Sequence, residues 1–298
     1  MYIHPQHMLS FIALVKTGSV GAAATARCLT QPAISNQLKQ LQETIGMPLY
    51  QRKGRGVQLT GVGESFYVHA LKVQQAMRDL DNFADELHDV QAGRIYLAAS
   101  QTIAGSLLPA ALCSFRALYP RIEVFVDSVN SQQVFQHMND HDLGLVESVL
   151  PSDVPECCHI EHLGEDEMVV VMPQHHPLSA YTSIHLSQLE DYPLIWREQG
   201  SGTREVLEQA WLASQGARPH VQLCMGGVSA VLESVRQGLG IGVVSQFCLP
   251  TGESLLTTRP LAPSLSRPMS LLQPRDASPL VKKFIDFLVP CLRSRLKL

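Results

Sequence analysis

The sequence predicts a multidomain α+β protein with a small helical N-terminal domain, one long helix and a C-terminal α/β domain of two lobes. Three observations predict this order. A small-residue helix, a polar-faced helix and a basic turn occupy Gly18 to Thr60. A proline-free amphipathic stretch follows from Gly61 to about Val90. From Gly93 onward, short β-rich runs alternate with helices, which is typical of an α/β domain with largely parallel sheets.

The N-terminal stretch has the element order of a winged helix-turn-helix. Thr30 stands where an N-cap belongs, and Pro32 follows in the first turn, where a missing N–H costs nothing. Apolar residues then recur every three or four positions, which leaves a short polar outer face. The turn from Gln51 to Gly56 combines glycines with three cations and is the predicted wing. The small residues of the preceding helix are Ala22, Ala23, Ala24 and Ala26, and the apolar positions of the capped helix are Ala33, Ile34, Leu38, Leu41 and Ile45.

The polar outer face and the basic turn favour DNA as a partner. Ser, Asn and Gln side chains bond base edges or phosphates in a major groove, and Lys and Arg bind phosphates. Residues 1–60 hold six Lys and Arg residues and a single acid, Glu43, whereas the whole chain has a formal net charge of −4. A basic module on an acidic protein is typical of a nucleic-acid-binding domain. We expect DNA contacts from Thr30, Gln31, Pro32, Ser35, Asn36, Lys39, Arg52, Lys53 and Arg55.

Residues 61–92 are predicted to form a linker helix that needs a partner. Apolar residues recur at helical spacing from Val62 to Leu87, so a broad apolar area faces outward. The polar residues include six acids and two bases, unlike a DNA-contacting surface. The same helix of a second chain is one partner that covers such a face, and the chain's own C-terminal domain is the alternative.

Residues 93–298 are predicted to form two α/β lobes with a cleft between them. Ligands of such domains bind at the carboxyl ends of the strands. The predicted strands are Arg94–Ser100, Ile122–Asp127, Leu143–Glu147, Met168–Met172, Leu194–Trp196 and Gly240–Val244. The predicted helices are Ser106–Leu118, Thr203–Ser214, Val228–Gln237 and Pro279 to about Leu292, of which the last returns to the first lobe.

Three strand-to-helix junctions are the candidate ligand loops. Hydroxyls and backbone N–H groups at helix starts bind anions without a metal. The loop from Gly200 to Arg204 adds glycines and a guanidinium, so the loops favour a carboxylate, a sulfur oxyanion or a phosphorylated metabolite. Ordinary helix capping is the alternative for each loop, and Arg204 has Glu208 one turn on as an ion-pair partner. The candidate effector contacts are Ser100, Gln101, Thr102, Ser128, Asn130, Ser201, Thr203 and Arg204.

Several motifs together resemble the LysR-type transcriptional regulators. The family's pattern appears in Leu9–Val15 with Gly18-Ser19, Thr30-Gln31-Pro32-Ala33-Ile34-Ser35, Gly46-x-Pro48-Leu49-Tyr50-x-Arg52, Leu59-Thr60-x-x-Gly63-Glu64, His176-Pro177-Leu178 and Gly238–Gly242. Two positions depart from that pattern. Arg27 stands where leucine is common, and Asn36 stands where arginine often follows the motif serine. Because Asn36 lies on the predicted recognition helix, we do not assume a typical operator sequence.

The resemblance implies a domain plan and a set of partners. It implies a winged helix-turn-helix over 1–60, a dimerising linker helix over 61–92, and an effector domain over 93–298 that is similar to periplasmic solute-binding proteins. Lobe I is expected at about 93–163 and 267–298, and lobe II at about 164–266. The expected partners are double-stranded promoter DNA, a small anionic effector, further copies of this chain as a dimer or tetramer, and RNA polymerase. No cofactor and no membrane contact are expected.

A metal- or redox-responsive regulator is the alternative function. Two histidines four residues apart on a predicted helix can chelate zinc or copper. The stretch has no CxxC pair, however, so we assign no metal ligand. Its residues are His137, His141, Cys157, Cys158, His159 and His162.

A two-lobed α/β enzyme is the other alternative. The sequence has neither a G-x-S-x-G nucleophile elbow nor a phosphate-cradling P-loop, so we expect no catalysis. Seven cysteines without framework spacing favour a reducing compartment. The first eight residues have no apolar run of a secretion signal, so we expect a cytoplasmic protein.

Overall fold

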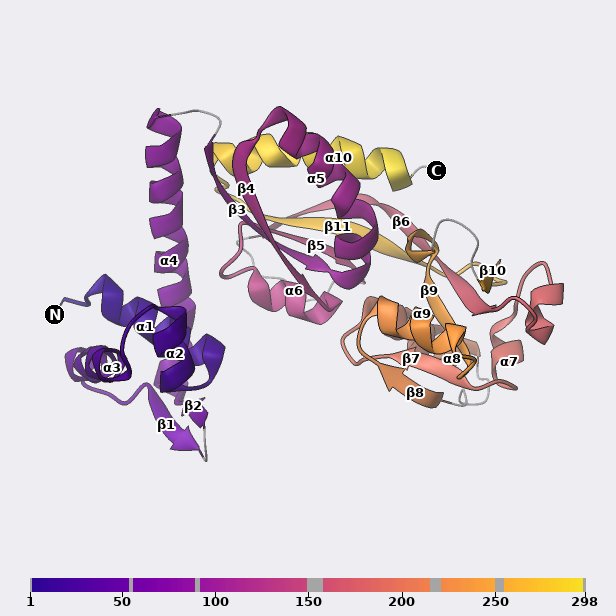
Figure 1. The fold of residues 1–298 in the computed structure, drawn as a ribbon, viewed down its shortest axis with the longest axis horizontal. Helices are drawn as coiled ribbons and strands as arrows, with labels where there is room; N and C mark the ends of the chain where they lie inside the picture. Colours follow the sequence, from indigo (N-terminus) through magenta and orange to yellow (C-terminus); the bar gives the residue numbers. More distant parts are fainter. Residues whose placement is uncertain are drawn as a thin grey trace. The chain divides into compact units, whose positions relative to one another are not determined.

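The computed structural model describes residues 2–53, 56–88, 92–148, 158–214, 221–249 and 255–296. Its contacts divide the chain into two compact units, Met1–Ala84 and Asp85–Leu298. Figure 1 labels the helices and strands of both units.

The first unit is a three-helix domain with a β-hairpin, followed by a long helix. Its elements are α1 (Pro5–Thr17), α2 (Val20–Ala26), α3 (Gln31–Ile45), β1 (Tyr50–Lys53), β2 (Gly56–Leu59) and α4 (Gly61–His88). The core between them is built from Phe11, Leu14, Ala23, Ala24, Ile34, Leu38, Leu41 and Leu49. Of the four alanines predicted to pack, Ala22 and Ala26 are exposed, because a seven-residue helix buries only one narrow side.

Helix α3 begins after its N-cap residue, Thr30, and ends at Gly46. The Thr30 hydroxyl accepts a hydrogen bond from the Ala33 N–H at 3.4 Å, and Pro32 occupies the first turn. Gly46 ends the helix with φ +78°, a left-handed conformation that glycine adopts without a steric penalty. The predicted capped helix is confirmed.

The hairpin pairs antiparallel and leads directly into α4. Tyr50 lies opposite Leu59 and Lys53 lies opposite Gly56. The predicted wing cation Arg55 lies outside the described residues, as does the side chain of Arg52.

Helix α4 is held against the hairpin by Thr60. The Thr60 hydroxyl accepts from the Gly63 N–H at 3.0 Å and donates to the Pro48 carbonyl oxygen at 2.7 Å. A Cβ on Gly63 would lie 1.8 Å from the Leu49 carbonyl oxygen, so only glycine permits this approach.

The second unit is an α/β domain. Its first half contains β3 (Ala92–Ser100), η1 (Ile103–Leu107), α5 (Leu108–Leu118), β4 (Arg121–Val129), α6 (Ser131–His137), β5 (Leu143–Glu147) and β6 (Cys158–Pro173). The second half contains η2 (Pro177–Ala180), α7 (Leu186–Leu189), β7 (Leu194–Arg197), α8 (Gly202–Ser214), β8 (Val221–Met225), α9 (Val228–Arg236), β9 (Ile241–Ser245), η3 (Gln246–Cys248), β10 (Leu256–Pro260), β11 (Ser266–Pro274) and α10 (Pro279–Leu296).

The strands follow the order β4-β3-β5-β11-β6-β9-β7-β8, with β10 paired to β6. β3 is parallel to β4 and β5, and β7 is parallel to β8 and β9. β6 and β11 pair antiparallel with each other and with their other neighbours, so the prediction of a largely parallel sheet holds only for the outer groups. In Figure 1 these two long strands pass from one half of the domain to the other.

Strand β6 is longer than predicted. The apolar run Met168–Met172 is only its second half, which pairs with β9 and β10. The first half, from Cys158 to Glu167, pairs with β11 and is mostly polar. The two halves of β6 therefore belong to different lobes.

Each lobe has its own core. In lobe I, α5 and α10 pack against the sheet that contains β3 and β5. The rings of Phe115 and Phe284 meet edge to face there, with their centroids 4.8 Å apart. The last helix returns to this lobe, as predicted. In lobe II, Trp196 and Trp211 lie 5.7 Å apart in the core between β7 and α8.

Across the described ranges, no single helix combines the length and apolar content that a membrane span requires. The helices α1 and α2 reach the required length and apolar content only when they are taken together, and the chain bends by 118° between them.

The close approach at Gly63 gives a first prediction. Gly63→Ala should destabilise the first unit by about 1–3 kcal/mol, because the new Cβ forces α4 away from the hairpin. Urea unfolding of the full chain measures this. Gly61→Ala, where a Cβ meets nothing within 4 Å, is the matched control and should change stability by no more than a few tenths of a kcal/mol. Equal effects of the two substitutions would contradict the packing described here.

Candidate functional site

The outer face of α3 is polar and exposed. Ile34, Leu38 and Leu41 point into the core. The predicted DNA contacts on the opposite side are all exposed, namely Thr30, Gln31, Pro32, Ser35, Asn36 and Lys39. One side of the helix is thus anchored in the domain, and the other presents hydroxyl, amide and ammonium groups together.

Lys39 is the cation that the described part of α3 presents on this face. Lys39 Nζ lies 3.6 Å from Glu43 Oε1, but both side chains are exposed, and such pairs contribute little. Lys53 is exposed on β1. Arg27, at the unusual position, donates to Gln6 Oε1 of α1 at 2.6 Å and so braces two helices.

The first candidate loop lies at the junction of the two lobes. Ser100 ends β3, and both Ser100 and Thr102 are almost completely buried. Gln101 Oε1 accepts a hydrogen bond from Arg197 Nη2 of β7 at 2.6 Å. Arg197 also pairs with Glu198 at 2.9 Å. Burial acts to raise the pKa of Glu198, but the hydrogen bonds and charge of Arg197 outweigh it and lower that pKa.

The second loop both caps a helix and reaches the third loop. Asn130 accepts from the Gln133 N–H at 2.9 Å, and Gln133 Oε1 accepts from the Asn130 N–H in return, which forms a capping box. Asn130 Nδ2 also donates to the Gln199 carbonyl oxygen at 3.4 Å. Ser128 is exposed on β4.

The third loop packs its backbone against lobe I. A Cβ on Gly202 would lie 2.1 Å from the Glu147 carbonyl oxygen. The Gly202 N–H donates to Ser131 Oγ at 3.2 Å, and Ser131 Oγ donates to the Glu147 carbonyl oxygen at 3.2 Å. Ser201 and Thr203, on either side of this glycine, are almost completely buried. Glycine is therefore required where the lobes meet.

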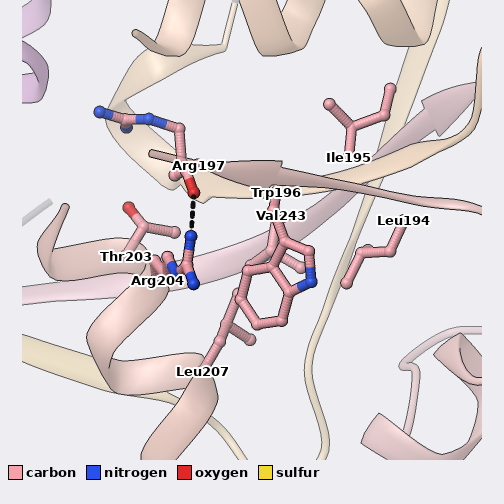
Figure 2. A pocket seen from close by; sticks show the side chains of 8 residues that line it. All are labelled: Leu194, Ile195, Trp196, Arg197, Thr203, Arg204, Leu207 and Val243. Atoms are coloured by element: carbon pink, nitrogen blue, oxygen red, sulfur yellow. Dashed lines mark hydrogen bonds between the residues drawn. The ribbon is translucent and has the colours of Figure 1, made fainter. Parts of the chain in front are cut away.

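Arg204 is held within lobe II. Its Nε lies 2.8 Å from Glu208 Oε1, the ion pair considered in the sequence, and its guanidinium lies 5.7 Å from the centre of the Trp196 ring. Figure 2 shows Arg204 donating to the Arg197 carbonyl oxygen, at 3.4 Å, in a small pocket beside Leu207. In this conformation that pocket has no room for a water molecule.

A buried charge cluster at the lobe junction was not predicted from the sequence. Arg267 of β11 is fully buried and lies 2.8 Å from Asp166 Oδ2 and 3.5 Å from Glu147 Oε1. It also donates to Thr102 Oγ1 at 3.3 Å, and Asp166 accepts from Ser245 Oγ at 2.6 Å. In the sequence, these three residues appear only as charged residues at the end of a strand (Glu147) or within one (Asp166 and Arg267).

The two carboxyl groups of this cluster share one guanidinium. Burial raises the pKa of Glu147 and of Asp166, and the charge of Arg267 offsets part of that rise. Asp166 has the shorter contact to Arg267, at 2.8 Å, and accepts from Ser245. Glu147 lies farther away, at 3.5 Å, and has a hydrogen bond with the Thr102 side chain.

Three buried side-chain oxygens at the lobe junction have no hydrogen-bond partner among the described residues. They are Ser100 Oγ, Glu147 Oε2 and Thr203 Oγ1. Ser100 is two residues from Thr102, which binds Arg267, and Thr203 follows Gly202, whose Cβ would lie 3.2 Å from Arg267 Nη1. An unpartnered buried hydroxyl is uncommon and calls for a partner, such as a ligand.

The His- and Cys-rich stretch falls on separate elements. His137 is the last residue of α6 and His141 follows it before β5, so the helix is shorter than predicted. Cys158, His159 and His162 lie on β6. Cys157 lies outside the described residues.

Comparison with known proteins agrees with both units. Residues 5–64 match the bacterial regulatory helix-turn-helix proteins of the lysR family, and residues 88–291 match the LysR substrate binding domain. The chain is 32% identical over 241 residues to the HTH-type transcriptional activator CmpR of Synechocystis, covering 80% of this chain and 78% of that protein.

Two solved structures share the fold. Full-length CbnR in complex with its target DNA aligns with a TM-score of 0.69 at 16% identity, over 97% of this chain and 99% of that one. The regulatory domain of CcmR from Synechocystis PCC6803, in complex with 2-PG, aligns with a TM-score of 0.61 at 27% identity, over 66% of this chain and 96% of that one. The chain therefore belongs to the LysR family of DNA-binding transcriptional regulators, which are not enzymes.

Proposed function

We propose that this regulator responds to a small anion bound between the two lobes of its effector-binding domain. The observation that carries this proposal is the set of unpartnered buried oxygens on Ser100, Glu147 and Thr203 at the lobe junction, where Glu147 Oε1 lies 3.5 Å from Arg267. A hydroxyl or a protonated carboxyl group donates to an anion, and Arg267 supplies positive charge close by. The 2-PG complex of CcmR, a relative of similar fold, supports an anionic ligand class.

The ligand contacts come from both lobes. Ser100, Gln101 and Thr102 belong to lobe I, and Ser201 and Thr203 belong to lobe II. Asn130 and Ser128 form the rim of the site in this proposal, whereas Arg204 acts by supporting the third loop. A ligand held by both lobes stabilises one lobe geometry over another, which is the basis of a population shift.

The DNA contacts follow from the exposed face of α3. We propose that Gln31, Ser35 and Asn36 read base edges, that Thr30 and Pro32 set the start of the helix against the backbone, and that Lys39 binds phosphate or guanine. The hairpin cations Arg52, Lys53 and Arg55 bind phosphates on the flank.

Helix α4 is the proposed dimerisation element. It exposes large apolar side chains at Val68, Val73, Leu80 and Phe83, of which Leu80 is 66% and Phe83 is 55% exposed. An apolar stripe along one helix is typically covered by a partner, and a second copy of α4 supplies a matching stripe. We propose a dimer or tetramer whose arrangement on promoter DNA, in the cytoplasm, changes with effector and alters its contact with RNA polymerase.

Because α3 is proposed to read bases and the wing to bind phosphates, substitutions in the two elements should have different effects. On duplexes selected by the full chain from a random pool, Asn36→Ala should lose about 1–3 kcal/mol of affinity for the preferred sequence and little for others. Lys53→Ala should weaken all duplexes alike and reduce the slope of log K against log salt by about 1. Fluorescence anisotropy at several salt concentrations measures both effects.

Lys282→Ala is the control, because Lys282 is an exposed lysine on α10, an element with no part in the proposed DNA or dimer contacts. A salt slope that falls equally for Lys53→Ala and Lys282→Ala would overturn the assignment of the wing.

The hydroxyls at the lobe junction predict a loss of anion response. Thr203→Val and Ser100→Ala each remove a donor without adding bulk, so the affinity for an anion should fall about tenfold or more. Thermal unfolding of the full chain with 2-PG, phosphate, sulfate and a dicarboxylate identifies the anion that stabilises the wild type. Ser114→Ala, an exposed hydroxyl on α5, is the control. The proposal fails if none of these anions stabilises the wild type, or if the junction variants respond as it does.

The raised pKa of Glu147 predicts a pH effect. Because its folded pKa lies above its ordinary value of 4.5, the stability that the neutral carboxyl group contributes is present below that value and is lost as pH rises through the folded pKa. Glu147→Gln keeps the shape without the titration. The Tm of this variant minus the wild-type Tm should therefore increase from pH 4.5 upward, and a difference that stays constant with pH contradicts the burial of a titrating Glu147.

A further inference from the structure

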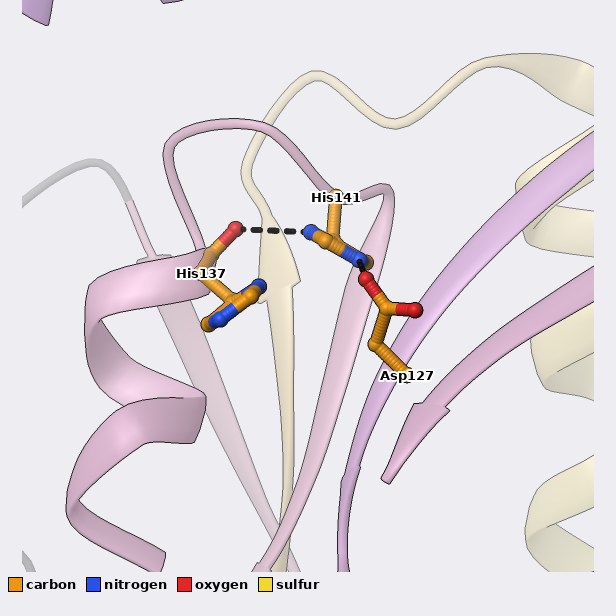
Figure 3. A group of neighbouring side chains, drawn as sticks. All are labelled: Asp127, His137 and His141. Atoms are coloured by element: carbon orange, nitrogen blue, oxygen red, sulfur yellow. Dashed lines mark hydrogen bonds and ion pairs between the residues drawn. The ribbon is translucent and has the colours of Figure 1, made fainter. Parts of the chain in front are cut away.

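A second polar cluster in lobe I lies at the far end of α6 from the lobe junction. Asp127 of β4, His137 at the end of α6 and His141 before β5 each offer one ligand atom, and these atoms all lie within 4.8 Å of one another. Figure 3 shows the three side chains converging from a strand, a helix end and the following turn. The effector-site proposal uses none of them.

The backbone keeps the two histidines in helical register past the end of α6. The His141 N–H donates to the His137 carbonyl oxygen at 3.0 Å, so one further α-turn follows the helix. The two rings lie on the same side, with centroids 4.9 Å apart. Histidines in this i, i+4 relation are a common chelating pair for transition metals.

The chain after His141 is fixed to the sheet that carries Asp127. The Asp142 side chain accepts from the Tyr96 N–H at 2.6 Å, and the Asp142 N–H donates to the Tyr96 carbonyl oxygen at 2.8 Å. Tyr96 lies on β3, which pairs with β4 along its whole length. Asp127 and His141 are thereby brought together from different elements.

The hydrogen bonds of His141 orient its ring as a metal-bound imidazole is oriented. Its Nδ1 lies 2.8 Å from Asp140 Oδ1, and its Nε2 faces Asp127 Oδ2 at 2.9 Å. A carboxylate that holds the Nδ1–H leaves the Nε2 lone pair for a metal, which is the usual support for a histidine ligand.

The dimensions are close to those of a metal site. Bonds of 2.0–2.1 Å in tetrahedral geometry place neighbouring ligand atoms about 3.3 Å apart. To bind a metal, His141 Nε2 and Asp127 Oδ2 must move apart from 2.9 Å by a few tenths of an ångström, and the ligand nitrogen of His137 must move closer to them. The side chain of Asp127 is 60% exposed, which gives an ion access from solvent and leaves room for water ligands.

We propose that Asp127, His137 and His141 bind a divalent transition-metal ion. Two imidazole nitrogens and one carboxylate oxygen suit zinc, nickel, cobalt or copper, rather than calcium or magnesium, which prefer oxygen ligands. No metal ligand was assigned from the sequence because the stretch has no CxxC pair, and Asp127 lies outside that stretch. The cysteines and histidines of β6 take no part in this site.

The test uses the full chain after removal of metal with a chelator. Zn²⁺ titrated in competition with a chromogenic chelator should bind with one site per chain that depends on the three residues. Asp127→Asn and His137→Gln should each weaken that site about tenfold or more. Co²⁺ should give visible d–d absorption in the wild type that the two variants lose. Circular dichroism checks that both variants fold.

His162→Gln is the matched control. His162 is 57% exposed and lies 3.7 Å from Glu165, so it is a histidine–carboxylate pair without the second histidine, and its loss should leave Zn²⁺ binding unchanged. His7→Gln tests whether Zn²⁺ binds instead to His4 and His7 of the first unit, whose ring centroids lie 4.9 Å apart. No Zn²⁺ binding tighter than millimolar, or binding that falls with His7→Gln but not with Asp127→Asn, overturns the proposal.

Discussion

The fully buried guanidinium of Arg267 is the interaction on which the effector domain depends. It lies where β11 runs beside β6, the two strands that connect the lobes, and it contacts Asp166, Glu147 and Thr102 at once. A buried ion pair is costly to desolvate, and removing one partner leaves an uncompensated charge. The cluster therefore fixes the relative placement of these strands, and through Thr102 and Glu147 it places the loops that carry the proposed effector contacts.

Hydrogen bonds connect this cluster to the start of α6 and to lobe II. Glu147 accepts from Ser131 through its carbonyl oxygen, and Ser131 in turn receives the Gly202 N–H of lobe II. Ser131 begins α6, a helix of seven residues and about 10 Å that ends at His137. The proposed anion site and the proposed metal site thus lie at opposite ends of one short helix in lobe I.

The elements that could be predicted are those whose ends and apolar spacing are set by residues close together in the sequence. Thr30 and Pro32 define the start of α3 within a few residues, and the apolar spacing of α3 follows from its own sequence, so the helix-turn-helix was predicted correctly. The full length of β6 was not, because its first half is stabilised by β11 and not by an apolar run of its own. Arg267 and Thr102 are 165 residues apart, and no spacing rule connects such partners. Asp127 and His141 are only 14 residues apart, but they lie on different elements and come together because β3 holds both segments.

The most direct test of the central claim is amide hydrogen exchange of the full chain, with and without the anion that stabilises it most. An anion held between the lobes slows exchange at segments 100–103 and 200–204 together, because the opening of either lobe exposes both. That joint protection is the predicted result. Protection confined to one of these segments, or appearing only elsewhere in the chain, would contradict an effector site at the lobe junction.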